Sequence, residues 1–186
     1  MRGAFPPVQI IEQFEYYTIT GSTSSQIDKQ LLAHADPGDA SAHATTRSRF
    51  EIRKKLQQHS GRCEITELVV SVSITTKLPT WQPQHKVSAS LKSRWEKSSD
   101  LLRRHEAGHR EHAIDVAQHL LTTLLSIDPN HSCFALDASI GLELQASMQR
   151  LNMRDTRYDN RTRNGLRDDP LFSRSHAPKT AIHASQ

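Results

Sequence analysis

One stretch of the chain constrains the fold more than any other: from Leu91 to Leu124, apolar and small side chains recur at steps of three and four residues. This spacing predicts one face of a helix of about nine turns. The face reads Leu91, Trp95, Ser98, Leu102, His105, His109, Ala113, Val116, Leu120 and Leu124. Asp128-Pro129-Asn130 then ends the helix. Two histidines therefore stand where a core-facing helix ordinarily has apolar residues.

The residues before this helix predict a sheet. Phe14–Thr23 is aromatic and β-branched, and Arg47–Leu56 is moderate strand material. The best strand begins at Cys63, and its apolar residues alternate until the phase slips by one residue near Glu67, which predicts a β-bulge. Pro79 is expected to end it.

A short helix is predicted between the first two strands, and a second long helix near the end of the chain. Thr23–Gln26 fits a capping box for a helix that runs to about His34. Cys133–Leu151 predicts the second long helix, and 154–172 is expected to be irregular. The apolar face of this second long helix would be Ile140, Leu144, Met148 and Leu151.

The fold class is therefore α+β: a small, mostly antiparallel sheet with a short helix, followed by two long helices. We expect an N-terminal extension over 1–13, a single domain over 14–172 and a disordered tail over 173–186.

Composition excludes some classes of function. No run approaches the roughly 18 apolar residues that span a membrane. The N-terminus is a poor signal peptide because Pro6-Pro7 breaks its short apolar stretch. The net charge is +4, but the 24 Lys and Arg are mixed with 20 acidic residues and form no basic stripe with aromatics. We therefore expect no nucleic-acid partner.

The two cysteines leave two interpretations open. Cys63 and Cys133 form no C-x-x-C pair, so a cysteine-based zinc site is not indicated. They are either two free thiols or one disulfide, and a disulfide would require an oxidising compartment.

The motif His105-Glu106-Ala107-Gly108-His109 matches H-E-x-x-H on the predicted long helix. Positions i and i+4 lie on one helix face, so the two imidazoles can bind the same Zn²⁺. Glu106 would then take a proton from a metal-bound water as general base. With 11 histidines in the chain, a buried, hydrogen-bonded pair of core histidines is the alternative.

A catalytic zinc site needs a third protein ligand. His112 lies too far along a straight helix to be a good one, and it is expected either to line the site or to be a surface histidine. Glu143 on the next helix, or Asp159 beyond it, would complete a His-His-carboxylate set.

The order of several short motifs resembles a bacterial family of predicted secreted zinc-dependent proteases, a domain of largely unknown function. The matching pieces are YYTITGST, Cys63 before the long strand, LPTW at 78–81, Trp95, LLRRHEAGHREHA and YDNRTRNG at 158–165. The resemblance implies a zincin-like peptidase with zinc on His105 and His109, catalysis by Glu106, a protein or peptide substrate, and a periplasmic or secreted location.

In that family the downstream motif reads Y-D-x-x-T-x-H-G, and its histidine would be the third ligand. This chain has Asn164 there, and a neutral amide is a weak zinc donor. Asp159 or His112 would then compensate, Asn164 would bind weakly or through a water, or the protein would be a non-catalytic metal-binding or protein-binding member. Tyr158 would either stabilise the oxyanion or serve as a packing aromatic.

Overall fold

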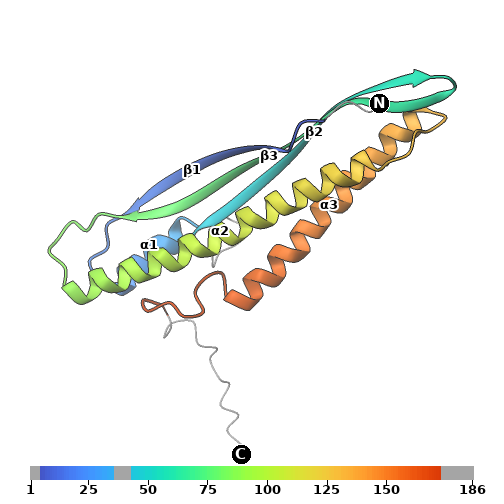
Figure 1. The fold of residues 1–186 in the computed structure, drawn as a ribbon. Coiled ribbons are helices and arrows are strands. Elements are labelled where there is room, and N and C mark those ends of the chain that lie inside the picture. Colours follow the sequence, from blue (N-terminus) through green and yellow to red (C-terminus); the bar gives the residue numbers. More distant parts are fainter. Residues whose placement is uncertain (1–4, 36–42, 173–186) are drawn as a thin grey trace, which may run out of the picture.

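The computed structural model describes residues 5–35 and 43–172. Three strands form one sheet, and two long helices lie along one of its faces (Figure 1). The elements in chain order are β1 (Gln9–Ile19), α1 (Ser24–Ala33), β2 (Thr45–His59), β3 (Arg62–Trp81), α2 (Ala89–Leu125) and α3 (Cys133–Thr162). The predicted α+β class is confirmed. None of the helices described is long and apolar enough to cross a membrane.

The central strand of the sheet is β3, in the order β1-β3-β2. β2 and β3 form an antiparallel hairpin whose turn, Ser60-Gly61, has positive φ angles of 50° and 78°. Two such residues match the twist of a two-residue hairpin loop. The predicted bulge is present, because Lys55 pairs with Glu67 but Leu56 pairs with Ile65.

β1 adds to the other edge of β3 in parallel and begins at Gln9. The strand predicted from Phe14 therefore begins five residues earlier, since residues 9–13 pair with β3 from Ser71 onward. Pro79 does not end β3, which runs on to Trp81. The β2 ladder reaches β3 only as far as Lys77, so Pro79 lies beyond the part of β3 that β2 covers, where a missing N–H is tolerated.

The caps of the first two helices follow from the sequence. Thr23 caps α1 by accepting a hydrogen bond from the Gln26 amide, as predicted, and the Gln26 side chain reaches back to the amide of Ser22. Ser88 caps α2 in the same way through the amide of Leu91. These bonds satisfy amides that the first turn of a helix leaves without a partner.

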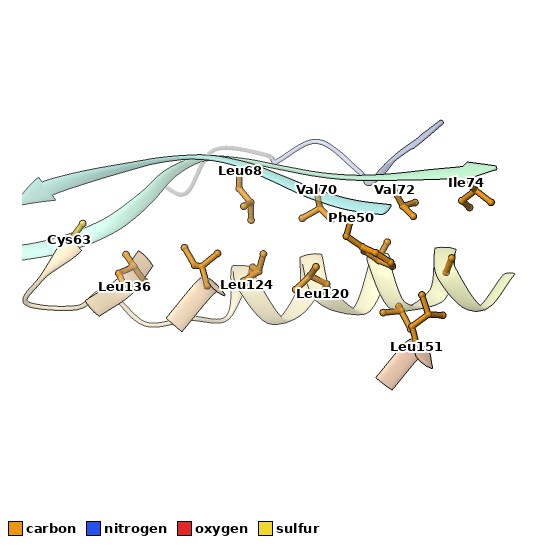
Figure 2. Packing of buried hydrophobic residues seen from close by; sticks show 14 residues of the cluster. Phe50, Cys63, Leu68, Val70, Val72, Ile74, Leu120, Leu124, Leu136 and Leu151 are labelled. Atoms are coloured by element: carbon orange, nitrogen blue, oxygen red, sulfur yellow. The ribbon is translucent and has the colours of Figure 1, made fainter. Parts of the chain in front are cut away.

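The core lies between β3 and the helices. Figure 2 shows Leu68, Val70 and Val72 of β3 pointing toward Leu120 and Leu124 of α2, and all five are almost fully buried. Burying one such side chain contributes about 1.5–3 kcal/mol. The stripe predicted from the sequence is thus the packing face of α2.

α3 is longer than the sequence predicts, because it continues past Leu151 to Thr162. The expectation that 154–172 is irregular is therefore wrong for its first nine residues. Met148 was expected on the buried face but is 51% exposed, and Ser147 is buried in its place. The last turns of α3 carry polar groups that face α2, so no apolar period marks them.

A disulfide joins Cys63, at the start of β3, to Cys133, at the start of α3. Asn130 lies beside it and exchanges two backbone hydrogen bonds with Cys63. Of the two interpretations of the cysteines, the structure therefore has the bonded one. The expected tail over 173–186 lies outside the described residues.

Candidate metal centre

The H-E-x-x-H motif lies in the middle of α2, where the helix passes beside the end of α3. His105 and His109 stand one turn apart, and their Nε2 atoms approach to 3.2 Å. His105 is 6% exposed and Glu106 only 3%. His105 and Glu106 are therefore part of the interior, and His109 is partly buried beside them.

Asp159 of α3 completes a group of three donors. Its Oδ1 lies 2.8 Å from Nε2 of His109 and 3.1 Å from Nε2 of His105. Three ligands bound tetrahedrally to one zinc ion at its usual bond lengths lie about 3.3 Å from one another. The observed separations fit a common ion, and this trio is one of two groups in the described residues with metal-site spacing.

The other candidates for third ligand lie elsewhere. Glu143 precedes Asp159 by sixteen residues on α3, about 24 Å along the helix axis, and faces Arg150 instead. His112 bonds Asp155 through Nδ1 at 2.7 Å and lies beside the trio, as its position on the helix predicts. Asn164 follows α3 and lines the same cleft as the trio.

Two acceptors from α3 fix how the imidazoles are oriented. Thr162 donates its hydroxyl proton to the carbonyl of Tyr158 at 2.8 Å, so its oxygen accepts from Nδ1 of His105 at 3.2 Å. Nδ1 of His109 lies 3.0 Å from Asp155. A proton on each Nδ1 would leave the Nε2 lone pairs for a bound ion, as in metal-binding histidines. Without an ion, Nε2 of His109 needs a proton of its own to donate to Asp159. Two such lone pairs 3.2 Å apart require a cation or a proton between them.

The charges of the site agree with this requirement. Burial lowers the pKa of His109, but hydrogen bonds to Asp155 and Asp159 outweigh it and raise the pKa to about 10. Burial likewise raises the pKa of Asp159, yet bonds to His105 and His109 hold it well below its usual range. In the metal-free protein a proton therefore occupies His109 at neutral pH, at the place where a bound cation would put its charge.

Glu106 is the buried carboxylate beside the trio. Burial raises its pKa, and its Oε2 atom has no hydrogen-bond partner among the described residues. It opens on a cleft shared with β2, which contributes Thr45 and Thr46. The carboxylate also has a hydrogen bond with Thr46, so Oε2 is the oxygen with the position and the proton affinity of a general base.

Tyr158 packs on the histidines. Its ring stacks on His105 with centroids 4.8 Å apart and an interplanar angle of 7°. A Cβ on Gly108 would lie 2.5 Å from the tyrosine hydroxyl, so the motif needs glycine there. Tyr158 does not line the cleft of Glu106, and its contacts are those of a packing aromatic.

The turn after α3 also closes on the site. Asn164 has a φ of 53° and donates its amide to the carbonyl of Asp159. Gly165 follows with a φ of 77°, and a Cβ there would lie 2.9 Å from Cβ of His105. Glycine is therefore required both for the backbone conformation and for the space beside the imidazole.

Asp155 and Thr162 were missed by sequence reasoning. The signal that could have found them is their spacing from Asp159, four residues before and three after, which places all three on one helix face.

A family model described as "Bacterial protein of unknown function (DUF922)" matches residues 14–165. This span includes the whole centre on α2 and α3. The chain belongs to this family. A search of curated proteins finds no match, and neither does a search of solved structures.

The DUF922 match accounts for the motifs that carried the resemblance. Within Tyr158-Asp159-x-x-Thr162, the tyrosine stacks on His105, the aspartate joins the donor trio and the threonine orients His105. What is shown is membership of a bacterial family together with groups that could bind a metal ion.

Proposed function

We propose that this DUF922 protein is a zinc-dependent metallopeptidase. The observation that carries the proposal is the convergence of Nε2 of His105, Nε2 of His109 and Oδ1 of Asp159, with the unpartnered Oε2 of Glu106 beside them. Two imidazoles and one carboxylate are a donor set typical of catalytic zinc, which leaves one coordination position open. Protein or peptide would be the substrate.

In this proposal Thr162 and Asp155 hold the metal-binding histidines in place, and Glu106 transfers the proton. A zinc ion bound here would supply Lewis acidity toward a water molecule and a peptide carbonyl. Thr162 and Asp155 hold the two imidazoles in place, so the donors are aligned before anything binds. Glu106 accepts a proton from the water at Oε2 and can pass it to the leaving amine.

The compartment is part of the proposal. A disulfide persists in oxidising surroundings, and Cys63 is fully buried where it joins Cys133. This supports a periplasmic or secreted location.

Glu106→Gln tests the mechanism. The amide keeps the shape of the side chain but cannot take a proton, so cleavage of an unfolded protein substrate should fall by about 10²–10⁴-fold. Zinc content, measured by elemental analysis, should remain that of the wild type. Glu111→Gln, an exposed change on the same helix, is the control and should leave cleavage as it is. Equal cleavage by wild type and Glu106→Gln would exclude Glu106 as the base.

The second candidate is a non-catalytic, metal-binding or protein-binding member of the family. Asn164 favours it, since an amide lines the cleft at the position of the histidine in the motif Y-D-x-x-T-x-H-G. The same assay separates the two functions: a wild type that holds zinc in the trio but cleaves no peptide bond supports the second.

A further inference from the structure

Four arginines follow one face of α3. Arg150, Arg154, Arg157 and Arg161 are separated by four, three and four residues, which is the period of a helix face. The row spans about 16 Å along the axis. The sequence alone does not show it, because three of the four lie beyond Leu151, where the helix was expected to end.

These arginines line a groove between α3 and α2 together with His112 and Tyr158. None of the described residues that line it is acidic. A second hollow adjoins it, since Tyr158 and Arg161 line both, and this hollow adds Arg104 and Arg167 with Asp168 as its one acidic lining residue. Together the two hollows form a basic band that borders the metal centre at His105.

Most of this positive charge is uncompensated. Arg154 pairs with Asp115 at 3.1 Å, and Arg150 lies 3.9 Å from Glu143, both at exposed positions where a pair contributes little. Arg104 and Arg157 have no carboxylate partner in the described part of the chain. Arg161 lies over the ring of Tyr158, 5.6 Å from its centroid, and likewise makes no ion pair there.

We propose that the basic band binds an acidic segment of a polypeptide. An extended segment of about five residues matches the length of the arginine row. Its carboxylates would meet the guanidinium groups of Arg104, Arg157 and Arg161, which pair with no carboxylate among the described residues. Nucleic acid is less well matched, because single strands bind by stacking bases on free aromatic faces. Tyr158 has His105 stacked on its ring and Arg161 over it. The binding is independent of whether the metal centre hydrolyses anything.

The experiment is a titration of the full chain with a fluorescent ten-residue peptide rich in Asp and Glu, followed by anisotropy at low salt. The variant Arg157→Glu/Arg161→Glu should weaken binding by about tenfold or more, since each change removes an attraction and adds a repulsion. Lys86→Glu/Lys92→Glu changes the net charge by the same amount at exposed positions far from the band and should bind within about twofold of the wild type.

Three outcomes would overturn the proposal. The first is no binding of the acidic peptide by the wild type. The second is equal weakening in both double variants, which would make the attraction a matter of net charge. The third is tighter binding of a single-stranded oligonucleotide of equal charge, which would assign the band to nucleic acid. Circular dichroism of both variants establishes that loss of binding is not loss of fold.

Discussion

The two halves of α2 share the same helical spacing of buried residues but have different roles. From Ala113 to Leu124 the buried face is apolar and packs on β3. Around His105 and Glu106 the buried face is polar, and partners from α3 hold it. Burial of apolar side chains stabilises the half over 113–124. Around His105, burial of polar side chains costs free energy, which the hydrogen bonds to α3 offset. Apolar burial therefore dominates the half over 113–124, whereas the other half combines buried Leu91, Trp95 and Leu102 with the polar candidate centre.

The largest effect is expected in the apolar half. Leu120 is fully buried, so Leu120→Ala should lower the free energy of unfolding by about 2–5 kcal/mol, measured by urea denaturation. Zinc content should not change, because Leu120 is eleven residues from His109, about 16 Å along the helix. Leu142→Ala, at a position 65% exposed, is the control and should stay within about 0.5 kcal/mol. Loss of zinc from Leu120→Ala would mean that the two halves are not independent.

The next largest effect on the free energy of unfolding is expected in the polar half, when the proposed metal is removed. Zinc at a free concentration a hundred times its dissociation constant should stabilise the fold by about 2.7 kcal/mol relative to the chelated protein. Urea midpoints with zinc and with chelator measure this difference. His109→Ala removes one donor of the trio, so its midpoint should not respond to zinc. A wild type that responds no more than this variant would contradict the site.

The smallest effect is expected on zinc affinity, from removal of the hydroxyl group that orients His105. Thr162→Val keeps the shape but removes the acceptor for Nδ1 of His105, and zinc affinity should fall by about 10–100-fold. Thr162→Ser should restore it, since the hydroxyl returns. Thr156→Val removes the same kind of hydroxyl-to-carbonyl bond on an exposed turn of α3 and should leave the affinity unchanged. Equal affinities for Thr162→Val and the wild type would show that the threonine does not orient the ligand.

The sequence predicted the apolar half of this comparison better than the polar half. The spacing of apolar residues predicts the strands, the bulge near Glu67 and the buried face of α2. This spacing is present because these residues are buried between β3 and α2. The end of α3 has no such signal, because Asp155, Asp159 and Thr162 face the histidines and not a core. Their pairing across two helices depends on the tertiary fold. For the same reason the arginine row could not be recognised before the helix was seen to extend through it.

The disulfide has a consequence for the integrity of the chain. The bond between Cys63 and Cys133 closes a covalent ring that contains β3 from Cys63 onward and all of α2. A single backbone cut inside this ring, for instance in the loop over 126–132 between α2 and α3, would leave both pieces linked through sulfur. The histidines would remain tethered to the aspartate on α3 after such a nick. A protein exposed to peptidases would in this way keep its site assembled where an open chain would come apart.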